Sequence, residues 1–328
     1  MANKHANLDS LFNDIADAIR EKIGDESIIP AVDFPDLIRD RLQVAPTPYL
    51  TFKSLSSFTL KVNDTTKHWN GTLEYSTNAS TWTTWDGTTT LSSATKGSSN
   101  VLYLRGIGNS VITGSINYRW LLTGSDIKCI GNIENLLDYA TVEAGNHPTM
   151  ADYCYSRMFQ YCTALTQAPS LPATTLANYC YSWMFSRCTS ITQTPALPAT
   201  TLAEGCYNGM FYGTTLTQAP ELPATTLADK CYQDMFSYCT SLTQAPTLPA
   251  TTLPSYCYQY MFRGCTSLKL SSTQTGEYTV EYRIPSSGTG TAGINSLANM
   301  FTSTGGTFKG TPKINTTYYL SNTNTVVS

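Results

Sequence analysis

CYQDMFSYCTSLTQAPTLPATTL, at residues 231–253, is one copy of a unit that the chain repeats. Cys-Tyr pairs stand at 154, 180, 206, 231 and 257, and Met-Phe pairs at 158, 184, 210, 235 and 261. A fixed period near 26 residues is typical of stacked repeats, in which each copy buries its apolar side against its neighbours. The repetition therefore predicts a solenoid.

The apolar spacing inside each copy predicts the local structure. Cys, Tyr, Met, Phe and Cys fall at positions i, i+1, i+4, i+5 and i+8, which fit one face of a short helix. The prolines of the following LTQAPTLPATTL, residues 242–253, impose extended backbone. We therefore expect an α/β solenoid over residues 129–328, in which each repeat contributes a short helix and one strand. Gly131–Leu137 is the expected leading cap, and 294–320 the expected closing repeat.

Two segments precede the repeats. Residues 49–128 alternate in the manner of strands, with turn signals at Asp86-Gly87 and Gly108-Asn109, and predict a small β-sandwich. Residues 1–43 predict a helical module, joined to the sandwich by a stiff linker at 45–48. Its apolar stripe is Leu8, Leu11, Phe12, Ile15, Ile19 and Ile23. Phe34, Leu37, Ile38 and Leu42 predict a second short helix. Two helices this short cannot bury a core alone, so we expect docking or oligomerisation through the stripe; packing on the β domain is the alternative.

Composition excludes several classes of function. Charged residues make up 13% of the chain and the net charge is −3, so no nucleic-acid partner is expected. No apolar run is long enough to span a bilayer, and MANKHANLDSLFND lacks the apolar core of a secretory signal. Nine of the ten cysteines recur at two repeat positions, and stacking would place them in ladders. Reduced core thiols are favoured over disulfides, because a bridge within each repeat would leave Cys206 unpaired.

Nothing in the sequence indicates catalysis. The three histidines, His5, His68 and His147, lie near no nucleophile motif or second metal ligand, and no glycine-rich phosphate loop follows a strand. We therefore expect no enzyme, no catalytic residue, no cofactor and no metal.

Positions that differ between repeats suggest a binding surface. The triplets Tyr153-Arg157-Tyr161, Tyr179-Trp183-Arg187, Gly205-Gly209-Gly213, Lys230-Asp234-Tyr238 and Tyr256-Tyr260-Gly264 each have a spacing of four, which would place them on one helical row. Tyr, Trp and Arg dominate interface hot spots, and the glycine row between them suggests a shallow groove. The predicted ligand-binding residues are Tyr153, Arg157, Tyr179, Trp183, Arg187, Tyr238, Tyr256 and Tyr260; unconstrained solvent-facing positions are the alternative.

Trp85 is a further candidate for ligand binding. Trp82 and Trp85 are three residues apart, so on one strand they would face opposite sides, and an exposed indole could stack on a sugar ring. Packing of both rings in or against the sandwich is the alternative.

The repeat unit resembles the bacterial leucine-rich repeats of the BspA-like kind, through Met-Phe-x-x-Cys-Thr-Ser-Leu at 235–242. The segment before the repeats resembles the β domain that accompanies them in gut bacteria and their phages. IADAIREKIGDESIIPAVDFPDLI, at 15–38, resembles an amino-terminal module of phage tail and virion proteins. The resemblance implies a leucine-rich-repeat fold and a phage virion appendage of the tail-fibre or receptor-binding type, on the particle exterior. Virion proteins or a second copy would bind residues 1–43, and a host glycan or protein would bind the repeats. A bacterial surface adhesin is the alternative.

Overall fold

The segment that carries the Cys-Tyr and Met-Phe pairs is a run of linked turns in the computed structural model, which describes residues 47–64 and 66–327. Every fourth residue has a positive φ angle: 58° at Tyr153, 57° at Arg157 and 65° at Tyr161. We call the segments built in this way layers 1 to 6: residues 153–161, 179–187, 205–213, 230–238, 256–264 and 295–303. A right-handed helix requires negative φ throughout, so no layer is helical.

Backbone hydrogen bonds alternate between two kinds of partner. The Tyr155 N–H donates to the Cys180 carbonyl of the next layer over 2.8 Å, whereas the Ser156 N–H donates to the Tyr153 carbonyl of its own layer over 3.1 Å. The same alternation continues along each of layers 1 to 5. Because every second N–H bonds to the next layer, it cannot make the i−4 bond of a helix. These bonds fix the layers one against the next, and they satisfy the backbone donors of the turns.

The expected α/β leucine-rich-repeat solenoid is therefore wrong. α3 (Asn135–Glu143) is the one α-helix among the described residues, and it precedes the layers. The described chain is mostly β, in several small sheets, none of which closes around the layers. The proline-rich segments contribute only short strands: β10 (Leu165–Gln167), β11 (Gln244–Pro246) and β12 (Thr252–Leu253). The apolar spacing was misleading because a strict period of four also suits successive turns.

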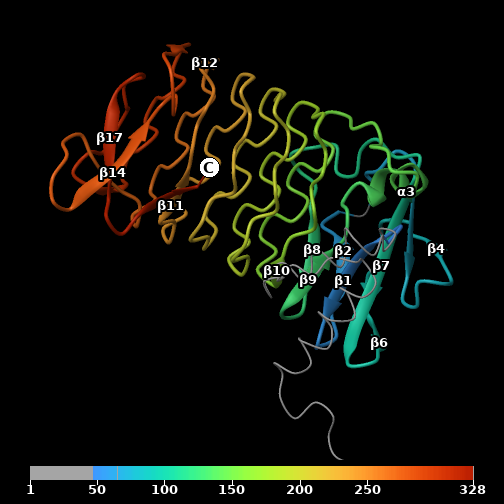
Figure 1. The fold of residues 1–328 in the computed structure, drawn as a ribbon. Helices are drawn as coiled ribbons and strands as arrows, with labels where there is room; N and C mark the ends of the chain where they lie inside the picture. Colours follow the sequence, from blue (N-terminus) through green and yellow to red (C-terminus); the bar gives the residue numbers. More distant parts are fainter. Residues whose placement is uncertain (1–46, 65, 328) are drawn as a thin grey trace, which may run out of the picture. The chain divides into compact units, whose positions relative to one another are not determined.

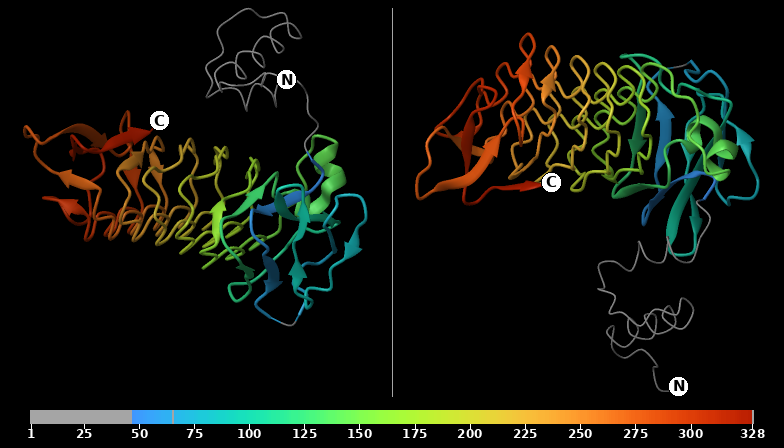
Figure 2. Two further views of the ribbon diagram at one scale, coloured as in Figure 1. Left: turned by 90° about the horizontal axis from the view of Figure 1, so that it is seen from below. Right: turned by 45° about the horizontal axis from the view of Figure 1, so that its top comes forward.

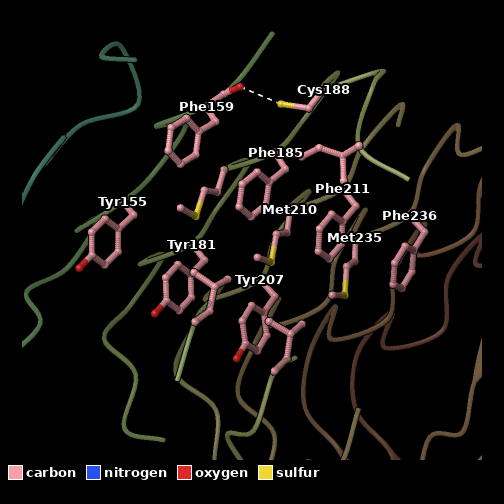
Figure 3. Packing of buried hydrophobic residues seen from close by; sticks show 14 of the residues in the cluster. Tyr155, Phe159, Tyr181, Phe185, Cys188, Tyr207, Met210, Phe211, Met235 and Phe236 are labelled. Atoms are coloured by element: carbon pink, nitrogen blue, oxygen red, sulfur yellow. Dashed lines mark hydrogen bonds between the residues drawn. The ribbon is translucent and has the colours of Figure 1, made fainter. Parts of the chain in front are cut away.

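Two aromatic ladders form the core between the layers (Figure 3). One joins Tyr155, Tyr181, Tyr207, Tyr232 and Tyr258, with ring centroids 5.6–5.9 Å apart from layer to layer. The other runs from Phe159 through Phe185, Phe211, Phe236 and Phe262 to Phe301 of layer 6. All of these side chains are buried. Burial of identical rings in register is an apolar contribution that helps to offset the strain of the left-handed residues.

Strands lie at both ends of the layers (Figure 1). The seven-stranded sheet has the order β10-β9-β1-β7-β3-β4, with β6 also on β7. Its further strands are β9 (Ile127–Ile130), β1 (Leu50–Ser54), β7 (Ser99–Ile107), β3 (Thr72–Ser76), β4 (Thr83–Thr84) and β6 (Ala94–Lys96). The three-stranded sheet is β5 (Leu91–Ser92), β2 (Thr59–Val62) and β8 (Trp120–Thr123). These two sheets are compatible with the predicted β-sandwich.

The first layer continues the core of these sheets. Phe52 of β1 lies 6.2 Å from Phe159 between ring centroids, and Trp120 of β8 also lies 6.2 Å from that ring. The Trp120 N–H donates to the Met158 carbonyl over 2.7 Å, and β10 pairs in parallel with β9. The side of layer 1 that has no preceding layer is thereby covered, as a terminal repeat requires.

Strands that lie before and after layer 6 in the sequence form sheets at the other end of the stack (Figure 2), and the C-terminal strand returns along the stack to pair with the segment that follows layer 4. A four-stranded sheet has the order β14-β17-β13-β16, and two pairs join β11 to β18 and β12 to β15. The bounds are β13 (Lys269–Ser271), β14 (Tyr278–Arg283), β15 (Thr291–Ala292), β16 (Gly305–Gly306), β17 (Thr317–Ser321) and β18 (Thr325–Val327). The predicted module at 1–43 and its apolar stripe lie outside the described residues.

All ten cysteines are buried free thiols. The second cysteine of a layer donates its S–H to a phenylalanine carbonyl of the preceding layer: Cys188 to Phe159 over 2.9 Å, and Cys239 to Phe211 over 3.0 Å. Layer 3 has Thr214 at this position, and its hydroxyl donates to the Phe211 carbonyl of its own layer over 2.9 Å. The threonine therefore closes its own turn and does not reproduce the cysteine contact with the preceding layer.

Thiol alkylation gives a direct test of this arrangement. Burial raises the pKa of Cys162 and Cys239 to about 11, so little thiolate is available at pH 8. We expect iodoacetamide to leave the native protein essentially unmodified, and to label ten thiols after denaturation without reductant. Intact mass spectrometry reads the count, and fewer than ten labels would indicate disulfides.

Candidate binding surface

Eight of the predicted binding residues are left-handed positions of the layers, rather than a helical row. They have φ angles between 54° and 61°, and none is buried: Tyr153, Arg157, Tyr179, Trp183, Arg187, Tyr238, Tyr256 and Tyr260. The neighbouring positions, such as Cys154 and Tyr155, are buried. Each four-residue turn therefore places two side chains in the core and one at the surface, and the layer contacts align the surface residues along the stack.

The glycine row of layer 3 is covered, so the predicted groove is absent at that point. A Cβ atom on Gly205 would lie 2.2 Å from the Tyr179 ring, and one on Gly209 would lie 2.6 Å from the Trp183 ring. Both glycines are buried. The rings of layer 2 thus lie against the backbone of layer 3, and any larger residue there would push them away.

Arginine and aromatic side chains form a continuous strip across layers 1 to 5. Ring centroids lie 5.0 Å apart between Trp183 and Tyr212, and 5.3 Å apart between Tyr212 and Tyr238. Guanidinium groups stand over these rings in cation–π geometry: Arg157 over Trp183, Arg187 over Tyr212, and Arg263 over Tyr238 and Tyr260, at 4.4–5.4 Å from the centroids. We call these seven residues the arginine–aromatic strip.

The arginine at the first end of the strip has a like-charged neighbour. Burial lowers the pKa of Arg157, and the positive charge of Arg119 lowers it further. Arg119 itself stands 5.2 Å over the ring of Tyr161, which is 51% exposed. Arginine remains protonated under all ordinary conditions, so two like charges are held close together at this end of the strip.

Sequence reasoning missed Tyr212, Arg263 and Arg119. Tyr212 and Arg263 stand one residue before the last left-handed position of their layers, where layers 1, 2 and 4 carry Gln160, Ser186 and Ser237. A comparison of this column between repeats would have found the two substitutions. Arg119 precedes β8, outside the repeats, and only the packing of that strand on layer 1 reveals its position.

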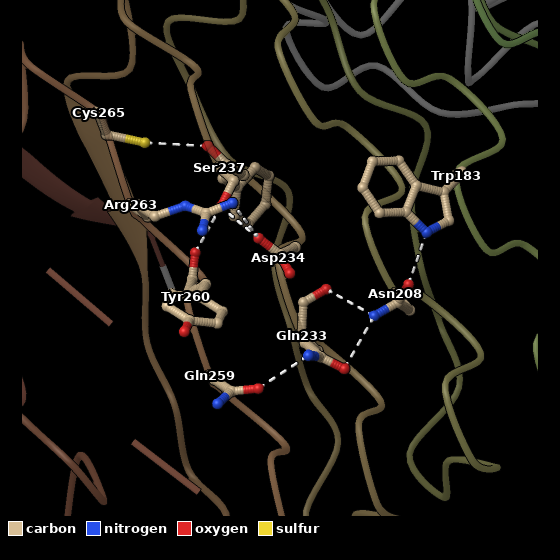
Figure 4. A network of polar contacts seen from close by, with 10 residues as sticks. Trp183, Asn208, Gln233, Asp234, Ser237, Gln259, Tyr260, Arg263 and Cys265 are labelled. Carbon is tan, nitrogen blue, oxygen red and sulfur yellow. Dashed lines mark hydrogen bonds and ion pairs between the residues drawn. The ribbon is translucent and has the colours of Figure 1, made fainter. Parts of the chain in front are cut away.

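A ladder of amide side chains fixes Trp183 from one side (Figure 4). The Trp183 Nε1–H donates to Asn208 Oδ1 over 2.7 Å. Asn208 Nδ2 donates to Gln233 Oε1 over 3.2 Å, and Gln233 Nε2 donates to Gln259 Oε1 over 2.8 Å. Each amide satisfies the next, so the indole is held in one orientation.

Tyr179 is fixed by stacking and by an ion pair. Its ring stacks on Tyr153 with centroids 5.1 Å apart, and its hydroxyl donates to Glu204 Oε1 over 2.7 Å. Lys230 Nζ lies 2.9 Å from the same carboxylate oxygen. The Lys230 hydrogen bond, then that of Tyr179, lowers the pKa of Glu204, and the same contact with Glu204 raises the pKa of Lys230. This neighbourhood is therefore electrically neutral.

Trp85 is not a binding residue. Its side chain is 1% exposed, packs against Trp69 and Trp120, and donates its Nε1–H to the Thr89 carbonyl over 2.9 Å. No face is left for a ligand. Trp82 is half-buried, and the Arg105 guanidinium lies 4.1 Å over its ring. Of the two readings made for this pair, packing in the β domain is correct.

Gly209 gives a test of how closely the rings and the glycine row fit. Replacing Gly209 by Ala adds both left-handed strain and a contact with the indole, and we expect a loss of about 2–4 kcal/mol of unfolding free energy. Gly213→Ala is the matched control, because a Cβ there lies 3.4 Å from Arg187, an ordinary contact. It should cost only about 1 kcal/mol. Urea denaturation measures both losses, and equal losses would contradict the close packing of Trp183.

Comparisons with known proteins name no relative. The chain matches no model of a known protein family, no curated protein and no solved structure. Among the described residues, no group of three or more His, Cys, Asp or Glu side chains could hold a metal ion. None of the described helices is long and apolar enough to cross a membrane.

Proposed function

We propose that this protein is a non-enzymatic phage virion appendage of the receptor-binding type, which presents its layers to a host glycan or protein. The observation that carries the proposal is the arginine–aromatic strip, in which tyrosine, tryptophan and arginine side chains lie at one surface. These residue types supply most of the binding energy in protein interfaces. The strip is also continuous across five layers, which suits an extended partner.

Rigidity supports the same proposal. Each strip residue is attached to a turn whose N–H groups bond alternately to the next layer and to their own layer, and the rings contact one another. Ordering a flexible side chain on binding costs about 0.5–1.5 kcal/mol, and a preordered surface avoids part of that cost. The alternative is that these contacts serve only the stability of the stack, and the binding experiments below separate the two.

The proposed location on the virion rests on the amino-terminal sequence. Residues 15–38 resemble a module of phage tail and virion proteins, and the stripe from Leu8 to Ile23 needs a partner surface. Virion proteins, or a second copy of this chain, are the proposed partners of residues 1–43.

Mass spectrometry of purified particles tests the address. Gradient-purified virions of the phage that encodes the chain should contain it in amounts comparable to known structural proteins. A variant without residues 1–43 should be absent from such particles while remaining folded. If the chain is missing from virions and is found on bacterial surfaces instead, the adhesin alternative replaces the virion proposal.

A further inference from the structure

We propose that the first half of the strip, together with the neighbouring Arg119 and Tyr161, binds acidic carbohydrate, with carboxylates of the sugar paired to Arg119, Arg157 and Arg187 and with sugar rings stacked on Tyr161 and Tyr212. This inference deepens the proposed function, because it names the chemistry of the receptor that the strip would recognise. It is carried by charge, by ring geometry and by the state of the backbone beneath the strip.

Charge is distributed unevenly over this face. The ion pairs on the described layers are Lys230 with Glu204, at 2.9 Å, and Arg263 with Asp234, at 3.1 Å. Arg119, Arg157 and Arg187 form no ion pair within the part of the chain that the structure describes. Three guanidinium charges therefore remain unneutralised at one end of the strip, although the whole chain has a net charge of −3. An anionic ligand is the complement of such a surface.

The rings of Tyr161 and Tyr212 beside these charges fit a sugar, whereas Trp183 is covered by Arg157 and by the backbone at Gly209. Each of the three arginines is paired with one aromatic ring, at 5.2–5.4 Å from its centroid: Arg119 with Tyr161, Arg157 with Trp183 and Arg187 with Tyr212. Aromatic faces are apolar and can stack on the C–H face of a pyranose, while the planar guanidinium forms two parallel hydrogen bonds to one carboxylate. A uronic or sialic acid residue has both features within a single sugar.

The backbone beneath the strip disfavours an extended peptide as the ligand. A peptide that adds to a sheet edge obtains its affinity from free main-chain N–H and C=O groups. In layer 2, the N–H groups from Tyr179 to Cys188 already donate either to layer 3 or to their own layer. Only side chains are available for recognition, and a glycan is recognised through side-chain stacking and hydrogen bonds.

The second half of the strip provides an internal contrast. Asp234 neutralises Arg263, and Ser237 donates to the same carboxylate over 2.8 Å. The ring of Tyr238 is 46% exposed, so this half offers stacking without net charge. We therefore expect neutral sugars of the same glycan to lie against Tyr238 and Tyr260. Its acidic sugars should lie against the three arginines without an ion pair, Arg119, Arg157 and Arg187.

A glycan array tests the proposal with the purified full-length protein. The array carries uronate and sialate oligosaccharides, each beside its carboxyl-reduced counterpart, together with phosphorylated glycans. We expect retention on some carboxylated sugars, at least tenfold weaker binding to the reduced forms, and weakening with added salt because the charges are screened. Equal binding to both forms, binding to phosphorylated glycans alone, or no binding would each overturn the proposal.

Variants connect the binding to the three arginines. Arg157→Gln and Arg187→Gln should each weaken binding about tenfold, the scale of one lost charge-assisted contact. Arg187→Lys keeps the charge but loses the planar fork, and should fall between parent and Arg187→Gln. Lys96→Gln is the matched control, because Lys96 stands 5.2 Å over Tyr103, away from the layers. It should bind like the parent.

The folded state of each variant is checked by its thermal unfolding. If both glutamine variants are folded and bind as tightly as the parent, the arginines have no role in recognition and the proposal fails. The array uses purified protein, so its result is independent of whether the chain is found in virions. If the protein binds acidic glycans on the array but is absent from purified virions, it is an acidic-glycan-binding protein that is located elsewhere.

Discussion

Replacing Phe211 by Ala should lower the unfolding free energy by about 3–5 kcal/mol, the range for loss of a buried phenylalanine. Phe211 is fully buried in the middle of the phenylalanine ladder, with Phe185 and Phe236 at 5.9 and 5.8 Å. The cavity cannot collapse, because interlayer hydrogen bonds on both sides fix the spacing of the neighbouring layers. Urea denaturation followed by circular dichroism measures the loss.

Phe308→Ala is the matched control for this change. Phe308 also contacts the ladder, with its ring 6.4 Å from Phe301, but it is only partly buried and stands beyond the last layer. Its loss should cost less than half as much. A Phe211→Ala variant within about 1 kcal/mol of the parent would mean that the aromatic ladder is not the main support of the stack.

Removing the more exposed tyrosine rings of the arginine–aromatic strip and the neighbouring Tyr161 should weaken attachment to host cells by about a hundredfold or more. This is the loss expected from removing hot spots of about 2 kcal/mol each. The variant combines Tyr161→Ala, Tyr212→Ala and Tyr238→Ala. Each of these rings is half-buried or exposed, so most of the core remains intact. Tyr179 and Trp183 are poorer choices, because they also cover Gly205 and Gly209. Flow cytometry with labelled full-length protein measures the change.

A threonine variant provides the control for this second experiment. Thr174, Thr200 and Thr251 are exposed on the extended segments between the layers. Their combined replacement by Ala should leave cell attachment unchanged. If the tyrosine variant attaches like the parent while the threonine variant does not, the binding face lies on the extended segments.

The repeat length and the buried positions could be predicted from the sequence, because they follow from recurrence alone. Cys154, Tyr155, Met158 and Phe159 are all buried, as are their counterparts in layers 2 to 5. The conformation could not be predicted in the same way. Turns that repeat every four residues and a helix with 3.6 residues per turn give nearly the same apolar pattern over nine residues. The interlayer hydrogen bonds distinguish the two conformations.

The choice between helix and turns is settled by contacts that are distant in sequence. The Tyr153 N–H donates to the Asn178 carbonyl, and a local pattern contains no record of this bond. Strict recurrence at 153, 157 and 161, together with glycine at 205, 209 and 213, was the one local signal, since glycine is favoured at positive φ. The glycine row suggests a groove from sequence alone, whereas in the structure it accommodates the rings of Tyr179 and Trp183.

The candidate surface was only partly accessible to sequence reasoning. The left-handed column was found because it varies between repeats. Tyr212 and Arg263 belong to the column one residue before it, and their long side chains extend to the strip. Trp85 was included because a sequence pattern cannot distinguish an exposed indole from a buried one. Residues 1–43 keep their predicted docking role as a proposal.

Oxidative footprinting of the full-length protein on its host cells tests the central claim most directly, because it reports which side chains a bound partner covers. Brief hydroxyl-radical exposure, followed by peptide mass spectrometry, compares free and attached protein. We expect strong protection of Tyr161, Trp183 and Tyr238, with unchanged oxidation of Trp82 and Tyr319. Attachment that leaves Tyr161, Trp183 and Tyr238 as reactive as in the free protein would contradict the claim that the layers present the binding surface.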